Sequence, residues 1–295
     1  MPDLALRVLL AVLLLATWTP PVAAQVADAP AAPWLTCADV ETFLRTAKIV
    51  GRRKDLPVGV TVPSRITLDD GRWRHDAAVQ NVDVKKSTFD GIMGTELNFR
   101  DAWQFNVAGY QLAKLLGFNM VLPYVDRVVS GHASSVSWWL ADAMMERERI
   151  RKKIRPPDPV SWNQQMYAAR VFHELLGDSD PNATNILITR DWRVWLIDFT
   201  RAFRQTRTLR RPEGLQQIDR RLLTRLREVT DDQLQQVLGP WLIRPEIQGL
   251  LARRERIVEL FDQQVAARGE SAVVYEFERT SEPCGAGLGV RAPDR

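Results

Sequence analysis

VFHELLGDSDPNATNILITRDWRVWLIDFTRAF, residues 171–203, is the most informative stretch of this sequence. Within it, Asp180 lies five residues before Asn185, and Asp198 follows thirteen residues after Asn185. Carboxylate and amide oxygens suit magnesium, and three such side chains on one scaffold can hold the ion against the phosphates of a nucleotide. The stretch therefore favours transfer of a phosphoryl group as the leading hypothesis.

The sequence between Asn185 and Asp198 predicts a tight β-hairpin. Apolar runs at 185–189 and 193–197 flank a turn at 191–192. The two arms of a hairpin return to the same end, so the amide and the carboxylate would lie close together. Both side chains could then reach one metal ion.

The order of these three residues, and the spacing of the first two, match the catalytic loop and the metal-binding hairpin of protein kinases. The segments FHELLGDSDPNATN and WLIDFTRAF carry this match. The chain resembles the kinase-like superfamily in its atypical branch, which includes the HipA-type, phosphoinositide-kinase-like and secretory-pathway kinases. The similarity covers residues 171–203 and extends back toward residue 58.

This resemblance implies an α+β protein with a two-lobe protein-kinase-like fold, in which a small antiparallel-sheet lobe precedes a larger helical lobe. It also implies ATP and Mg as cofactors, with Asp180 as the catalytic base and with Asn185 and Asp198 as metal ligands. Asp178 is an alternative base, and the spacing favours Asp180. The sequence departs from phosphoinositide kinases at Pro181, where they have Arg, so the resemblance does not extend to how this loop handles substrate phosphate.

The part of the sequence expected to bind the nucleotide lacks the charged pair of kinases. Kinases place a Lys on a strand and a Glu on the next long helix, and the matching positions here are Gln80 and Asn106. The two amides can hydrogen-bond across the cleft, but they supply no positive charge to a phosphate. Gly59 and Thr61 are the candidates for the turn that would cover the phosphates.

Three explanations are open for the missing charge. Another cation can replace the lysine, and the nearest in the sequence are Lys85, Lys86, Arg65 and Arg74. Alternatively, catalysis is weak or lost, and the chain is a pseudokinase that serves as a binding or scaffolding module. The third explanation is a register shifted by a few residues. A further alternative is a helical interaction protein with an accidental motif, in which the three motif residues lie far apart.

A run of arginines follows the metal-binding motif. Guanidinium groups beside the site favour an acidic or phosphorylated substrate, and we name Arg201 and Arg204 as candidate substrate residues. A solvated basic loop is the alternative. Arg201 lies three residues after Asp198, so it could bridge to Asp180 or Asp178.

The composition bounds the class of protein. The chain has 295 residues, of which 45% are hydrophobic and 26% are charged, which allows a buried core and argues against wholesale disorder. The formal net charge of +4, with a pI near 9.3, is too small to indicate a nucleic-acid partner. The sequence contains no Walker-type loop, zinc signature or Gly-x-Ser-x-Gly elbow, which excludes the corresponding classes of enzyme.

The amino-terminal segment predicts export. Arg7 precedes an apolar run at 8–16, and small residues at 22–24 suit cleavage after Ala24. The run is shorter than the roughly 20 residues that span a bilayer. We therefore expect a signal peptide at 1–24, a periplasmic or secreted protein, and no stable membrane span after cleavage. A retained anchor is the alternative.

Export also bears on the two cysteines. In an oxidising compartment Cys37 and Cys284 could form a disulfide that ties the ends of the mature fold together. Two unpaired thiols are the alternative.

Changes of composition divide the chain into segments. We expect the signal peptide at 1–24, a flexible leader at 25–36 and the small lobe at 37–140. A junction at 141–157 leads to the helical lobe at 158–283 and a tail at 284–295. Periodicity predicts helices at 38–47, 98–116, 159–176 and 231–238, a long helix opening at Pro245, and strands at 58–68, 72–82, 120–129 and 134–140. The basic runs 147–155 and 253–256 predict exposed helix faces. Trp138 and Trp139 could border an adenine pocket.

Overall fold

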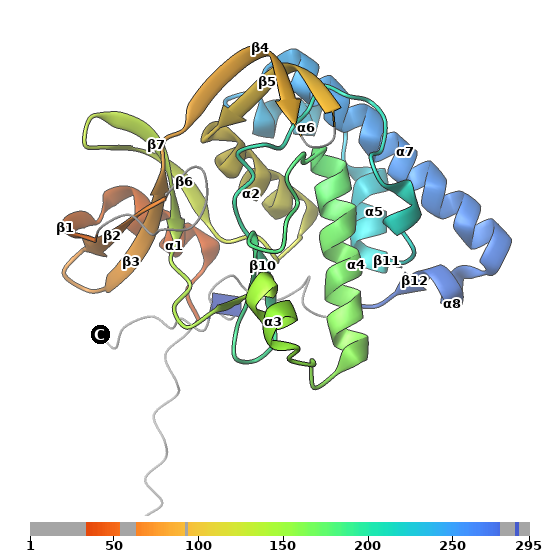
Figure 1. Ribbon diagram of the computed structural model, residues 1–295, viewed down its shortest axis with the longest axis horizontal. Helices are drawn as coiled ribbons and strands as arrows, with labels where there is room; N and C mark the ends of the chain where they lie inside the picture. Colours follow the sequence, from red (N-terminus) through yellow and green to blue (C-terminus); the bar gives the residue numbers. More distant parts are fainter. Residues whose placement is uncertain (1–33, 54–62, 92–93, 278–286, 289–295) are drawn as a thin grey trace, which may run out of the picture. The chain divides into compact units, whose positions relative to one another are not determined.

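The first half of the chain contains an antiparallel sheet with the strand order β1-β2-β3-β7-β6 (Figure 1). The structure is a computed structural model that describes residues 34–53, 63–91, 94–277 and 287–288. The strands of the sheet are β1 Lys48–Arg53, β2 Ser64–Asp69, β3 Arg74–Gln80, β6 Tyr124–Val129 and β7 His132–Trp138. A tight turn joins β2 to β3, between the two strands expected at 58–68 and 72–82. The Asp70 carboxylate accepts the N–H groups of Arg72 and Trp73 there, and Gly71 takes a φ of 86° that favours glycine.

The helix α1, Cys37–Thr46, covers one face of this sheet. Thr36 and Asp39 form a capping box that fixes where the helix begins, since each side chain accepts the backbone N–H of the other residue. Phe43 and Leu44 then pack with sheet residues such as Ile66 in a hydrophobic core of their own. The small lobe therefore has a core distinct from that of the helical half.

A second antiparallel hairpin, formed by β4 Asp83–Gly91 and β5 Gly94–Ala102, corrects one prediction. The helix expected at 98–116 begins later, because α2 spans Gln104–Leu116 and residues 98–102 belong to β5. The rings of Phe89 and Phe99 stack on this hairpin with centroids 4.2 Å apart. Such a cross-strand aromatic pair stabilises a sheet and offsets the helical periodicity of the sequence.

The helix α2 ends at Gly117, which has a φ of 66°, as the sequence predicts. Its buried face packs into the larger core together with the helical half. Gly109 permits a close approach there, since a Cβ at this position would lie 3.0 Å from Cδ2 of Phe199. The phenyl ring that follows Asp198 is thus seated directly against α2.

The second half of the structure is mainly helical (Figure 1). Its helices are α3 Glu146–Lys152, α4 Pro159–Leu176, α5 Arg220–Glu228, α6 Asp231–Leu238, α7 Arg244–Arg268 and α8 Glu270–Val273, with a 3-10 turn at Pro212–Gly214. Small sheets are formed by β8 Met144–Met145, β9 Ile186–Ile188 and β10 Val194–Leu196, and by β11 Ile218–Asp219 with β12 Val274–Tyr275. The segment 141–157 is therefore not a bare charged linker, because it contains β8 and α3. The α+β class is confirmed.

Arg253 of α7 is fully buried, which corrects the prediction of an exposed basic face at 253–256. Its guanidinium donates to the carbonyls of Leu175 and Leu176 at 3.0 and 3.1 Å, and to those of Arg204 and Thr206. The last carbonyls of a helix lack partners within the helix. Arg253 supplies hydrogen-bond donors to these carbonyls at the end of α4.

Two glycines make room for this guanidinium. A Cβ at Gly177 would lie 2.6 Å from Cζ of Arg253, and one at Gly249 would lie 3.0 Å from its Nη1. Gly177 also has a φ of 58° and ends α4, as predicted. Arg253 therefore anchors α7 immediately beside the loop that carries Asp178 and Asp180.

Several predictions fall on residues outside the described ranges. They are the signal peptide and most of the leader, the phosphate-covering turn at Gly59 and Thr61, and Cys284 with its proposed bond to Cys37. These stay predictions. Within the described residues, every helix is too short or too polar to cross a membrane.

Candidate functional site

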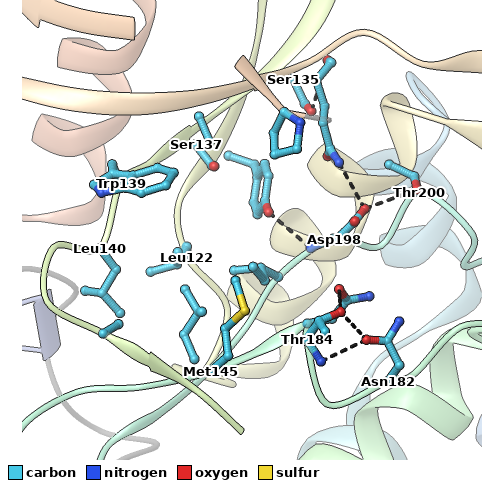
Figure 2. A pocket seen from close by; sticks show the side chains of 18 of the residues that line it. Leu122, Ser135, Ser137, Trp139, Leu140, Met145, Asn182, Thr184, Asp198 and Thr200 are labelled. Atoms are coloured by element: carbon cyan, nitrogen blue, oxygen red, sulfur yellow. Dashed lines mark hydrogen bonds between the residues drawn. The ribbon is translucent and has the colours of Figure 1, made fainter. Parts of the chain in front are cut away.

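A cavity of about 460 Å³ lies between the first sheet and the helical half (Figure 2). Apolar side chains line one side of it, and those labelled in Figure 2 are Leu122, Trp139, Leu140 and Met145. Polar side chains line the other side, and they include Gln80, Asp101, Asp180, Asn182, Asn185, Asp198, Thr200 and Arg201. A space with one apolar and one polar end suits a nucleotide, whose base is flat and whose phosphates are charged.

The hairpin β9–β10 brings Asn185 and Asp198 into this cavity. Ile197 N–H donates to the carbonyl of Asn185 at 3.0 Å, which closes the open end of the hairpin next to Asp198. At the turn, Trp192 has a φ of 62°, and its carbonyl accepts the side chain of Gln165 at 3.0 Å. The amide and carboxylate that the sequence singles out thus line the same cavity.

Asp198 has an unusual backbone and a fully specified orientation. Its φ is 59°, a region that Asp tolerates better than most residues and that clusters at functional sites. Its N–H donates to the Tyr124 hydroxyl at 3.3 Å, while its Oδ1 accepts from Gln80 Nε2 at 3.2 Å and Thr200 Oγ1 at 3.1 Å. Burial raises the pKa of Asp198, because removing water disfavours the carboxylate.

Gln80 and Asn106 meet at the back of the cavity. Asn106 is fully buried and donates to Gln80 Oε1 at 2.6 Å and to Ser135 Oγ at 3.1 Å. Its own oxygen accepts the N–H of Phe199 at 2.7 Å. The two amides therefore connect β3, α2 and the motif at 198–200, as a charged pair would in a kinase.

The loop after α4 presents Asp180 and hides Asp178. The Asp180 carboxylate accepts Asn182 Nδ2 at 3.0 Å and its side chain is 44% exposed, so it remains accessible from the cavity. Asp178 is buried, accepting His173 Nδ1 at 2.9 Å and the N–H of Asp180 at 2.9 Å. This geometry favours Asp180 over Asp178 as a group that meets a substrate.

Of the arginines after Asp198, Arg201 and Arg204 are partly buried, whereas Arg207 is exposed. Arg204 forms an ion pair with Glu96 at 2.9 Å and donates to the carbonyl of Arg100 at 2.6 Å, so it lies against the β4–β5 hairpin. It does not line the cavity, unlike Arg201. Nη1 of Arg201 lies 3.6 Å from Asp180, as the sequence suggested.

The four cations nearest to Gln80 in the sequence lie elsewhere, since the cavity is lined by none of them. Arg65 pairs with Asp76 at 2.5 Å and stacks over Trp139. Lys85 lies 3.9 Å from Asp83. Among the described residues, the lysines and arginines that line the cavity are Arg147 and Arg201.

The donor set fits a hard divalent cation. The Oδ2 of Asp198 receives no hydrogen bond from the described part of the chain. Asn185 donates through its nitrogen to the carbonyl of Asp180 at 3.3 Å, and its oxygen accepts the Thr184 hydroxyl at 3.3 Å, which leaves one of the two lone pairs of this oxygen for a metal. No group of three or more His, Cys, Asp or Glu residues in the described ranges could hold a metal alone. Magnesium suits such a site, because it commonly takes one or two protein ligands plus phosphate oxygens.

Three residues at this site have no counterpart in the sequence-based predictions. Tyr124 supports the backbone of Asp198, Thr200 donates to its carboxylate, and Asp101 lines the polar end of the cavity. Thr200 lies inside the motif and could have been noticed there. Asp101 and Tyr124 come from other elements and carry no local signal.

Solved structures of kinases share this fold. A hydra Fam20 solved with sugar matches at a TM-score of 0.59 with 14% sequence identity, over 82% of this chain and 93% of the other. The Golgi casein kinase matches at 0.56 with 13% identity, and its form with Mn and ADP bound at 0.57 with 14%; each covers 82% of this chain and 80% of the other. Neither a protein-family model nor a curated protein sequence matches the chain. The kinase-like resemblance and the two-lobe fold are confirmed, and at this identity the comparisons show the fold alone.

Proposed function

We propose that this protein is a kinase-like phosphotransferase that binds ATP with Mg in the cavity and transfers a phosphoryl group to a hydroxyl acceptor. The observation that carries the proposal is the convergence of Asp180, Asn185 and Asp198 on the polar end of one cavity. The opposite end is apolar and borders Trp138 and Trp139, which suits an adenine base. That the fold neighbours include a kinase solved with Mn and ADP supports this choice of ligand.

The charges in the cavity support a requirement for the metal. Asp101, Asp180 and Asp198 line the polar end, and Arg201 is the cation beside them. Such a surface would repel the phosphates of ATP. A magnesium ion held by Asn185 and Asp198 would neutralise part of this charge and orient the phosphates.

Asp180 would accept the proton of the acceptor hydroxyl. Its carboxylate is exposed toward the cavity, and Asn182 holds it through one oxygen. General base catalysis of this kind contributes about 10²–10⁴-fold to a rate. Asp178 and His173 would orient the loop from behind, since Asp178 accepts the N–H of Asp180.

A pseudokinase that binds a ligand without turnover is the second candidate. The observation that favours it is the pair of neutral amides, Gln80 and Asn106, beside Asp198. An exported protein, as the amino-terminal sequence suggests, would also meet little nucleotide. A substrate that is acidic or phosphorylated remains part of the proposal, with Arg201 as the candidate contact; Arg204 is engaged by Glu96.

Calorimetry with ATP, with and without Mg, tests the proposal. Wild type should bind ATP only with Mg, Asp198→Ala should lose that binding, and Asp180→Ala should keep it. Phosphoryl transfer should be present in wild type and reduced by about 10²–10⁴-fold in Asp180→Ala. Equal binding by wild type and Asp198→Ala would overturn the site assignment, whereas binding without turnover in wild type would select the pseudokinase.

A further inference from the structure

We propose that Arg201 binds the terminal phosphates of the nucleotide and thereby replaces the missing strand lysine. This inference rests on the proposed function and adds a residue to it. The site lacks a positive charge at Gln80, and the four cations closest to it in the sequence do not line the cavity. Among the described residues, the cations that line the cavity are Arg147 and Arg201, so we look for the replacement there.

The position of Arg201 suits this role. It lines the cavity together with Asp198, and its Nη1 lies 3.6 Å from the carboxylate of Asp180. The group to be transferred must arrive between the metal-binding residue and the base. The other cation of the cavity, Arg147, follows Met145 on the apolar side and is exposed.

The guanidinium of Arg201 is held in place but is not saturated. Its Nε lies 3.5 Å from Asp101 and is buried, and no group in the described ranges accepts a hydrogen bond from it. Both carboxylate contacts are longer than the roughly 2.7–2.9 Å of charge-assisted hydrogen bonds. Arg204, three residues later, is engaged by Glu96 and by the carbonyl of Arg100.

Two aromatic rings set the direction of the side chain. The Cζ of Arg201 lies 5.1 Å from the ring centroid of Phe89 and 5.2 Å from that of Phe99. A cation held over aromatic rings keeps its charge and its donors, because the rings take up none of its N–H groups. The β4–β5 hairpin thus orients the planar guanidinium of Arg201, and a guanidinium binds phosphate through paired hydrogen bonds.

Binding of ATP, ADP and AMP in the presence of Mg tests this inference. In wild type we expect affinity to rise with each phosphate. In Arg201→Met, which keeps the aliphatic contact with the rings, the preference for ATP over AMP should fall by about tenfold or more, because hydrogen bonds to charged groups are the strong ones. Binding of AMP should change little. Arg201→Lys keeps the charge without the fork and should give an intermediate preference.

Two arginines serve as comparisons. Arg207→Met changes an exposed residue that does not line the cavity, and its preference for ATP should equal that of wild type. If Arg147→Met loses the preference while Arg201→Met keeps it, the inference is overturned.

If wild type binds no nucleotide with Mg, the proposed function fails first. If wild type binds and neither Arg201→Met nor Arg201→Lys alters the preference, only the role of Arg201 fails. Thermal melting of each variant checks folding, and should Arg201→Met not fold, Arg201→Lys decides alone.

Discussion

The side-chain amide of Gln80 donates a hydrogen bond to the carboxylate of Asp198 across 3.2 Å. A neutral donor therefore faces this carboxylate from β3, at the position that we predict for the kinase lysine. Asn106, at the position that we predict for the kinase glutamate, is neutral as well and donates to the Gln80 side-chain oxygen at 2.6 Å. The pair keeps the connections between strand, helix and motif while removing one charge of each sign.

Restoring the lysine should strengthen nucleotide binding. In Gln80→Lys an ammonium would reach Asp198 and the adjacent phosphates. Hydrogen bonds to charged groups contribute about 1.5–3 kcal/mol against about 0.5–1.5 for neutral ones, so we expect roughly tenfold tighter binding of ATP with Mg. Calorimetry measures the change. Gln80→Met is the control of similar size, and an equal gain in both variants would contradict the role of charge.

Removing the amide of Asn106 should destabilise the fold. Asn106→Leu leaves the buried N–H of Phe199 without its acceptor, and an unsatisfied buried group costs about 1–3 kcal/mol. Urea unfolding measures the free energy of unfolding. Asn163→Leu, at an exposed position of α4, should lie within about 0.5 kcal/mol of wild type. A similar small effect at Asn106 would show that the hydrogen bond to Phe199 contributes little.

Neutralising Asp198 should stabilise the protein while abolishing metal binding. Burial raises the pKa of Asp198 in the folded state above the value in the unfolded chain, so ionisation on raising the pH weakens the fold. The contribution of this group is fully present below the unfolded pKa of about 3.9, and it is lost as the pH rises through the folded pKa. Asp198→Asn should therefore have a higher Tm than wild type at pH 7, and the difference should shrink in acid.

The test is a series of melting curves from acid to neutral pH without metal. Asp142→Asn changes a carboxylate that is 69% exposed and serves as the control. A lower Tm for Asp198→Asn at pH 7 would contradict the sign. Titration with Mg and ATP on the same samples should show that the gain in stability accompanies a loss of binding.

Arg253 should be among the most sensitive positions for stability. Arg253→Met removes the donor to the buried carbonyl of Leu175 and one of two donors to that of Leu176, and each buried group left unsatisfied costs about 1–3 kcal/mol. Arg256→Met, three residues later on the same helix, is exposed and should change the free energy of unfolding by less than about 0.5 kcal/mol. Denaturant midpoints compare the two. Equal effects would mean that the carbonyls find water instead.

The sequence predicts the motif hairpin and the helix ends well, because their signals are local. Gly117 and Gly177 each end a helix with a positive φ, and Thr230 caps α6 together with Gln233. Asn185 and Asp198 are joined by a short hairpin, so their arrival in one cavity follows from spacing. Such local signals predict structure without any knowledge of the rest of the chain.

The prediction of a helix beginning at residue 98 was wrong, because residues 98–102 belong to β5. The apolar spacing of α2 continues weakly into residues 98–102, and a strand there depends on distant partners. The Phe99 ring packs beneath Arg201 and Arg204, which lie about a hundred positions away in the sequence. The prediction that Arg253 is exposed was wrong for the same reason, since the carbonyls that its guanidinium binds belong to distant segments.

The enclosure of Arg253 by two glycines links Gly177, at the end of α4, to Gly249 and Arg253 on α7. A side chain at position 177 would collide with the guanidinium, and a shorter residue at 253 removes that collision but takes away the hydrogen bonds to the carbonyls of Leu175 and Leu176. The effects of changes at these positions should not add, as expected for residues that share partners. Substitutions at Gly177, Gly249 and Arg253 therefore have to be tested in combination as well as singly.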